Sequence, residues 1–321
     1  MNNLPSVILV MALAIGGTVL AFWSDRTEAQ TPPADQQKPP QTQAAPAVEA
    51  KAADKPDPSA TNSLKELERA MHSVAQYSSV QARLVETVQL PDRSIKAEGR
   101  YLQGNMGARD YRMRLELRLK VGSQTGSLLE VCDGQILWTR HEVGNQPIIT
   151  RRNVQEILKA AERSAPIPHT ILISNMGLGG LSALLGSMHL SMNFQGIKPD
   201  ELRDRPVFVV QGGWQDQYVA LWRGVRQNQD KAFPDGLPSF VPDLVWLSVD
   251  QENGFPHRIQ YRKRIPGRKE SVTQPILTLD YLDVVLNEPL NAQEFEFKEP
   301  DRPTPIDRTE EFIKQFQPLS K

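Results

Sequence analysis

The residue types that most often carry out chemistry are sparse and scattered in this sequence of 321 residues. Its histidines, none of which lies three or four positions from another, are His72, His141, His169, His189 and His257. No local histidine pair therefore indicates a zinc site. The sequence also lacks the G-x-S-x-G, P-loop and H-E-x-x-H motifs. We therefore predict a protein that is not an enzyme, with no catalytic residue, no metal site and no cofactor.

The cysteine content and the charge exclude further classes. Cys132 is the only cysteine, which excludes an intrachain disulfide and a multi-cysteine metal site. We interpret it as a small apolar residue that packs near a turn, and a reactive thiol is the alternative. The formal net charge is −1, whereas a protein that binds nucleic acid needs a concentrated basic face. Nucleic acid is therefore not expected as a partner.

Residues 1–29 are expected to be a signal peptide or a membrane anchor. The first charged side chains are those of Asp25 and Arg26, after a largely apolar run. Thr27 and Ala29 offer a cleavage site before Gln30, as in a signal peptide. An uncharged run of about twenty residues is also long enough to span a bilayer. Both alternatives place the remaining chain outside the cytoplasm, in the periplasm or cell envelope.

Two regions follow the apolar run. Residues 30–62 consist largely of Pro, Ala, Gln, Lys and Asp and contain no aromatic residue, so they cannot bury enough apolar surface to offset the entropy of ordering. We predict a disordered linker there and a single folded domain over residues 63–321.

The segment from Ser127 to Arg140 predicts a β-hairpin. Asp133-Gly134 between two β-rich runs is a strong hairpin signal. With these two residues as the turn, Cys132 lies opposite Gln135. Because paired residues share a face, one face is apolar and carries Leu129, Val131, Ile136 and Trp138. The predicted sheet therefore has an apolar face that another part of the protein must cover.

Hydrophobic periodicity predicts the other elements. A helix is expected from Asn62 or Ser63 to about Tyr77, because apolar residues there repeat at intervals of three and four. Strict alternation in residues 111–120 predicts a strand with Leu115 and Leu117 on its buried face. The other predicted strands are 80–89, 95–102, 207–211, 218–222, 244–250, 257–264 and 276–286. Further elements are helices at 154–163 and 310–316, and a last strand around Phe295 and Phe297.

Residues 171–192 form an apolar segment with no formal charge and several glycines. One interpretation is that it forms one or two buried helices that plug the sheet. The other is a movable lid over a binding cavity, because Gly and Met suit adaptable packing. The candidate lid residues in this segment are Met176, Leu181, Leu184, Leu185 and Met188.

The order of these motifs resembles the LolA-like family of outer-membrane lipoprotein-sorting proteins and lipoprotein carriers. The residues that carry the resemblance are the hairpin 129–138, the Asn253-Gly254 hairpin within 249–259, and the tail residues Leu290, Phe295, Phe297, Pro300, Ile306 and Asp307. The resemblance implies an α+β fold, a strongly curved, unclosed antiparallel β-barrel-like sheet with helices packed on its concave face. It also implies an apolar cavity for acyl chains, and a lid-holding arginine whose nearest counterpart is Arg109.

We therefore expect a non-catalytic extracytoplasmic binding protein for acylated or apolar ligands, with acyl chains, lipids or lipoproteins as partners. One alternative is an envelope regulatory sensor with a membrane-protein partner. The other is a structural envelope protein whose core is filled by its own side chains. The candidate ligand-binding residues are Leu115, Leu117, Leu129, Val131, Ile136, Trp138, Trp222 and Trp246.

Overall fold

A computed structural model describes residues 58–90, 92–105, 111–121, 123–144, 146–164, 180–219, 237, 241–265, 272–298 and 303–314. Twelve strands form one sheet, in the order β12-β6-β5-β4-β3-β2-β1-β11-β10-β9-β8-β7. The strands of the N-terminal half are β1 (Ser79–Gln89), β2 (Ser94–Asn105), β3 (Tyr111–Val121), β4 (Gln124–Asp133), β5 (Ile136–Val143) and β6 (Gln146–Asn153). Those of the C-terminal half are β7 (Met192–Glu201), β8 (Pro206–Trp214), β9 (Leu244–Asp250), β10 (Pro256–Arg264), β11 (Thr273–Leu286) and β12 (Ile306–Asp307).

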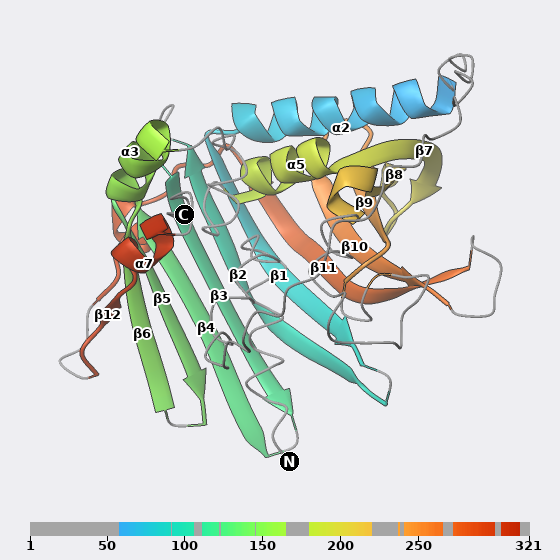
Figure 1. Cartoon of the computed structure of the whole chain (residues 1–321). Helices are drawn as coiled ribbons and strands as arrows, with labels where there is room; N and C mark the ends of the chain where they lie inside the picture. The colour runs from blue at the N-terminus through green and yellow to red at the C-terminus, as the bar shows by residue number, and fades with distance from the viewer. Residues whose placement is uncertain are drawn as a thin grey trace, which may run out of the picture.

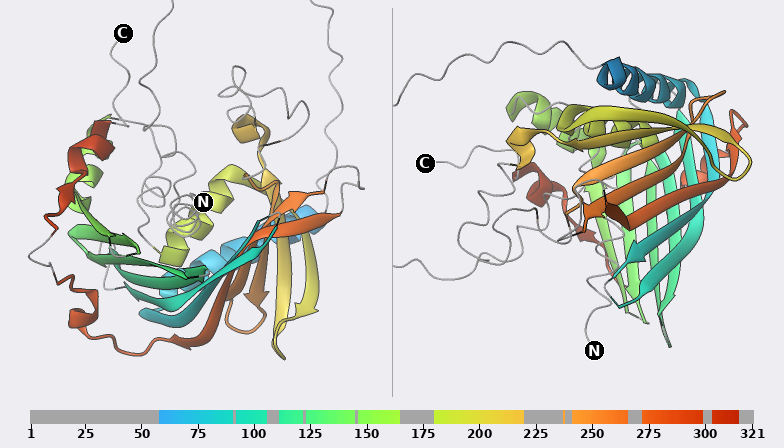
Figure 2. Two further views of the ribbon diagram at one scale, coloured as in Figure 1. Left: turned by 90° about the horizontal axis from the view of Figure 1, so that it is seen from below. Right: turned by 90° about the vertical axis from the view of Figure 1, so that its right-hand side faces the viewer.

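The predicted fold class is confirmed. All neighbouring strands pair antiparallel except β12, which pairs parallel with β6, and the end strands β12 and β7 do not pair with each other. Figure 2 shows that the sheet bends into a trough, with a helix on its concave side. No helix of the described residues is long and apolar enough to cross a membrane.

The helices are α2 (Pro58–Gln76), α3 (Val154–Ser164), α5 (Gly180–Ser191) and α7 (Thr309–Lys314), with a 3₁₀ turn η2 (Ala292–Phe295). Helix α2 runs across one end of the sheet and α5 lies beneath it (Figure 1). The start of α2 was predicted four or five residues too late. Proline is tolerated in a first helical turn, so the helix extends to Pro58, inside the expected linker. Ser63 is buried within the helix.

Several strand predictions need correction. Residues 216–219 are helical, so the strand predicted over 218–222 is wrong at its start, and residues 220–222 lie outside the described ranges. The strand expected around Phe295 is instead η2, which Asn291 caps by accepting a hydrogen bond from the Gln293 N–H at 3.0 Å. Strands β6 and β7 were not predicted.

The β4–β5 hairpin has a different register from the predicted one. Cys132 pairs with Leu137 and Val131 pairs with Trp138, so the turn residues are Gly134 and Gln135. Gly134 has φ +98°, which fits a turn with positive φ at its first central residue. Asp133 stabilises the turn because its Oδ1 accepts the N–H groups of Gln135 and Ile136, both at 2.8 Å. The turn is therefore shifted by one residue, and the composition of the two faces is unchanged.

The main core lies on the face of the sheet that α5 covers, which we call the inner face. Strand pairing shows which residues share this face. Leu84 of β1 lies on the same face as Leu117 of β3 and Leu128 of β4 on one side, and as Tyr281 of β11 on the other. All four side chains are buried in one cluster that includes α2, α3, α5 and α7. The inner face is therefore continuous over both halves of the chain.

The C-terminal segment 291–297 covers part of the opposite, outer face. The Phe295 ring lies 3.3 Å from the position that a Cβ of Gly104 would take. Arg114 Nη1 donates to the Glu294 carbonyl at 3.1 Å. Phe297 stacks on Trp138, with ring centroids 4.8 Å apart. The apolar hairpin face therefore packs against the C-terminal segment.

We predict that Phe295→Ala lowers the free energy of unfolding by about 3 kcal/mol or more, because it removes a fully buried ring and leaves a cavity. Urea denaturation measures the change. The exposed Gln293, in the same 3₁₀ turn, provides the control: Gln293→Ala should change stability by less than about 0.5 kcal/mol. Equal effects of the two substitutions would show that segment 291–297 does not hold the outer face.

Candidate functional site

Helix α5 contains no Asp, Glu, Lys or Arg, and it packs on the inner face of the sheet. Leu181, Leu184, Leu185 and Met188, the candidate lid residues within the described ranges, are all buried. A helix that is apolar on all sides is expected in a core rather than at a surface. Together with the sheet it therefore encloses an apolar interior.

The first turn of α5 is held by a polar contact with β2. The Leu181 N–H donates to Tyr101 Oη at 3.0 Å and to Gln103 Oε1 at 3.2 Å, and Tyr101 Oη donates to Gln103 Oε1 at 2.6 Å. Gly180 has φ +52°, and a Cβ there would lie 2.1 Å from Tyr101 Oη. The close approach therefore requires glycine at this position.

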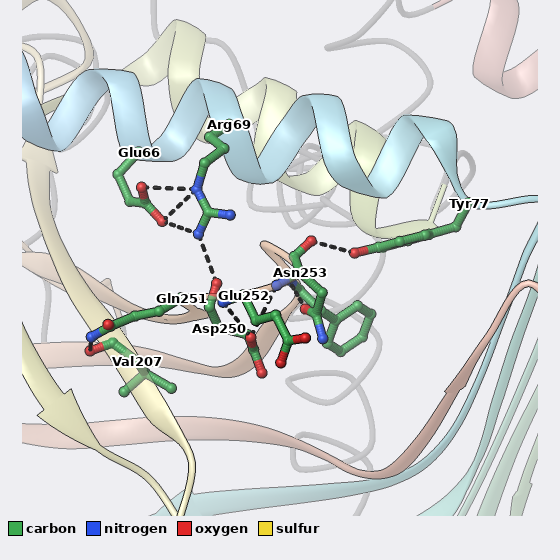
Figure 3. A network of polar contacts seen from close by, with 9 residues as sticks. Glu66, Arg69, Tyr77, Val207, Asp250, Gln251, Glu252 and Asn253 are labelled. Carbon is green, nitrogen blue, oxygen red and sulfur yellow. Dashed lines mark hydrogen bonds and ion pairs between the residues drawn. The ribbon is translucent and has the colours of Figure 1, made fainter.

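Helix α2 is fixed to the β9–β10 turn (Figure 3). Arg69 Nη2 pairs with Glu66 at 2.6 Å and donates to the Asp250 carbonyl at 2.7 Å. Tyr77 Oη donates to the Asn253 carbonyl at 2.5 Å. Gly254 has φ +77° and faces Ser73, whose Oγ would lie 2.5 Å from an added Cβ. These contacts hold the C-terminal half of α2, which makes it a fixed end wall of the trough.

Glu86 is a carboxyl group in the middle of the apolar inner face. It lies on β1, between Ala97 of β2 and Leu279 of β11, and it is fully buried. Neither carboxyl oxygen has a hydrogen-bond partner. Burial raises the pKa of Glu86 well above its ordinary value, because an apolar environment disfavours the charged form. The environment of Glu86 therefore favours its neutral form.

A second buried carboxyl, Glu130, lies on the inner face of β4 opposite Leu115 and Thr139. Burial raises the pKa of Glu130 to about 7, and the charge of Arg152 opposes this rise. Burial and the same arginine lower the pKa of His141. This half of the inner face therefore carries a carboxyl group with a pKa near 7 and a histidine whose pKa is lowered.

The structure separates the candidate ligand-binding residues onto two faces. Leu115 and Leu117 lie on the inner face, in the main core. Strand pairing places the four hairpin residues on the outer face, so the prediction that they line one cavity with Leu115 and Leu117 is wrong. These four residues are Leu129, Val131, Ile136 and Trp138.

Trp246 also lies on the outer face, paired with Gln211 and Gln260. The Arg262 guanidinium lies 4.0 Å from its ring centroid, which is a cation–π contact. Trp246 therefore does not line the inner face. Trp222, Arg109 and Met176 lie outside the described residues.

The physical reason for these errors is that both faces of the sheet are covered. The sequence pattern predicts that the more apolar hairpin face covers the core, but the C-terminal segment buries this face from outside. No sequence motif marks Glu86, Tyr101, Gln103 or Glu130 as a site residue. The pattern in β1 did contain a signal for Glu86, which occupies one position in an otherwise apolar alternation.

The inner face can bind apolar groups and offers isolated hydrogen-bonding groups. The described residues contain no group of three His, Cys, Asp or Glu side chains that could hold a metal ion. Two hollows lined by described residues lie elsewhere: one of about 430 Å³ at the ends of β3 and β4, and one of about 120 Å³ beside Trp246. Glu86 is fully buried, so a ligand can reach its carboxyl group only when the groups around it move.

No protein-family model and no curated protein matches this sequence. Similar solved structures include a DUF1329 family protein from Desulfovibrio piger, at 8% identity, 74% coverage of this chain, 97% of that chain and a TM-score of 0.34. LprF from Mycobacterium bovis has 11% identity, coverages of 72% and 96%, and a TM-score of 0.36. A LolA superfamily protein from Nitrosomonas europaea has 14% identity, coverages of 73% and 97%, and a TM-score of 0.28. One of these structures thus belongs to the superfamily that the sequence motifs resemble. At such TM-scores the similarity gives no information about function.

We predict that Glu130 makes stability fall as the pH rises. Its pKa of about 7 in the folded state exceeds the value of about 4.3 expected in the unfolded chain. The folded state therefore binds more protons between these values, and the contribution is complete below pH 4 and lost as the pH rises through 7. Between pH 4 and 8, the free energy of unfolding should fall by about 3 kcal/mol more in the unsubstituted protein than in Glu130→Gln.

Urea denaturation at several pH values measures this difference. Arg152 and His141 lie on the same inner face and are present in both proteins, so their titration largely cancels in the comparison. A difference in stability that stays constant from pH 4 to 8 would contradict the prediction.

Proposed function

We propose that this chain is a non-catalytic, extracytoplasmic binding protein for acylated or apolar ligands, such as lipids or lipoproteins. The observation that carries the proposal is the continuous apolar inner face of an open sheet, closed by the apolar helix α5. Residues 1–29 are assigned to export, as a signal peptide or an anchor, and residues 30–57 to a linker.

Burial of methylene groups drives uptake in this proposal. Each buried methylene contributes about 0.8 kcal/mol, so ten methylenes supply about 8 kcal/mol towards the free energy that binding costs. Because α2 is fixed to the β9–β10 turn, α5 is the element that we assign to the lid. Movement of Leu181, Leu184, Leu185 and Met188 with the helix would expose the inner face.

One alternative also has support in the structure. In this alternative the chain is a structural envelope protein whose core is filled by its own side chains. Leu84, Leu115 and Leu117 are completely or almost completely buried by other groups of the protein, as expected of an ordinary core. This alternative predicts that added bulk on the inner face lowers stability and that no ligand is involved. A sensor on the same fold would bind the ligand and also a membrane protein.

Substitutions at two neighbouring residues of β2 distinguish ligand binding from a self-filled core. Ala97 is buried on the inner face, and Lys96 points to the outer face and is exposed. We predict that Ala97→Phe reduces the amount of acyl ligand that co-purifies with the full chain at least fivefold, because the ring occupies ligand space. Lys96→Phe adds the same ring on the other face and should leave the ligand bound. Native mass spectrometry with lipid extraction measures both.

Thermal unfolding of the same proteins completes the test. If the inner face is filled only by its own side chains, Ala97→Phe overpacks the core and lowers the free energy of unfolding by about 1–3 kcal/mol. A ligand-free protein that also fails to bind added fatty acids and lipopeptides would overturn the proposed function.

A further inference from the structure

The inner face contains a polar group that an ordinary apolar core does not need. We propose that the Glu86 carboxyl is a hydrogen-bonding anchor for a hydroxyl group on the acyl chain of the ligand. The ligand class is therefore a hydroxylated acyl chain rather than a plain hydrocarbon chain. This inference rests on the proposed function, since it requires that acyl chains occupy the inner face.

The position of Glu86 suits an anchor. Strand β1 lies between β2 and β11 in the interior of the sheet, so Glu86 is far from both sheet edges. Its neighbours along β1 on the same face are Leu84 and Val88, and its cross-strand neighbours are Ala97 and Leu279. A ligand that reaches Glu86 therefore meets one carboxyl group among mainly apolar side chains, with Tyr261 and Tyr281 close enough for its charge to act on their pKa values.

The hydrogen-bonding capacity of the carboxyl is entirely unused. Both oxygens are buried and have no partner, and a buried polar group without a partner costs free energy. Tyr101 and Gln103, by contrast, already bond to each other and to α5. Oε2 of Glu130 also has no partner, but the charge of Arg152 acts on that carboxyl.

The chemistry of the site selects the ligand group. A neutral carboxyl offers one O–H donor and acceptor lone pairs. A hydroxyl group also donates and accepts, so it can satisfy both oxygens of Glu86, whereas an ester carbonyl only accepts and a methylene does neither. Burial raises the pKa values of Glu86, Tyr261 and Tyr281, which favours their neutral forms, and a charged ligand group would lose its hydration there. A neutral hydroxyl is therefore the best match.

Three matched fatty acids test the anchor. Octadecanoic acid is compared with its 3-hydroxy and 12-hydroxy derivatives, which place the hydroxyl at two depths, by competition against a fluorescent fatty acid on the full chain. We expect at least one hydroxylated chain to bind the unsubstituted protein at least fivefold more tightly than the plain chain. In Glu86→Leu this preference should disappear while the plain chain binds as well or better. Glu86→Gln should retain part of it, because an amide also donates and accepts.

The outer face provides the matched control. Glu98, on β2, is half-exposed and pairs with Lys96, so Glu98→Leu should keep the preference for the hydroxylated chain. Two results would overturn the anchor and leave the proposed function intact. One is that Glu86→Leu prefers the hydroxylated chain as strongly as the unsubstituted protein does. The other is that the unsubstituted protein binds the hydroxylated and plain chains equally well. If none of the chains binds the unsubstituted protein, both are overturned. Should Glu86→Leu not fold, Glu86→Gln and Glu86→Met carry the same comparison.

Discussion

The pairing of β1 with β11 is the constraint on which the rest of the structure depends. It joins the two halves of the chain, and its residues lie far apart in sequence: Arg83 and Asp283, 200 positions apart, form an ion pair at 2.9 Å. Without this pairing the sheet would divide into two smaller sheets, one of β1–β6 with β12 and one of β7–β11, and the inner face would not be continuous. Such long-range pairing forms slowly, because the entropy of closing the loop must be overcome first.

The register of this pairing is fixed at the end near α2. The ladder shifts between Gln81 and Arg83 of β1, where the facing strand β11 has one extra residue, a β-bulge that bends it. Asn287 has φ +64° and bonds to the chain just before β1: its Oδ1 accepts the Ser78 N–H at 2.9 Å, and its own N–H donates to the Ser79 carbonyl at 3.0 Å. A slip of one residue would turn every side chain of β1 to the other face. The same contacts that fix the register therefore keep Glu86 inside.

Local patterns in the sequence predicted local structure well, and they failed where a distant segment decides the outcome. The alternation in β3 correctly placed Leu115 and Leu117 in the core, and the antiparallel, unclosed sheet was confirmed. The side of the β4–β5 hairpin that faces the core could not be predicted, because the ring of Phe297 covers Trp138 from outside. Strand β7 was missed because Gly196 and Pro199 interrupt its pattern, and both are tolerated in an edge strand. No pairing between β1 and β11 can be read from either strand alone.

The division of polar groups between the two faces is the most informative consequence of this architecture. On the outer face, carboxylates pair with cations: Asp280 with Arg258 at 2.6 Å, and Glu116 with Arg114 at 2.5 Å. On the inner face, Glu86 has no such partner. An apolar residue of similar size would satisfy the packing there without the cost of an unpaired carboxyl. In our proposal, the carboxyl contributes instead through an interaction that the folded protein makes afterwards. A neutral ligand group that donates and accepts hydrogen bonds would supply that interaction, which links the least stable feature of the core to the proposed binding function.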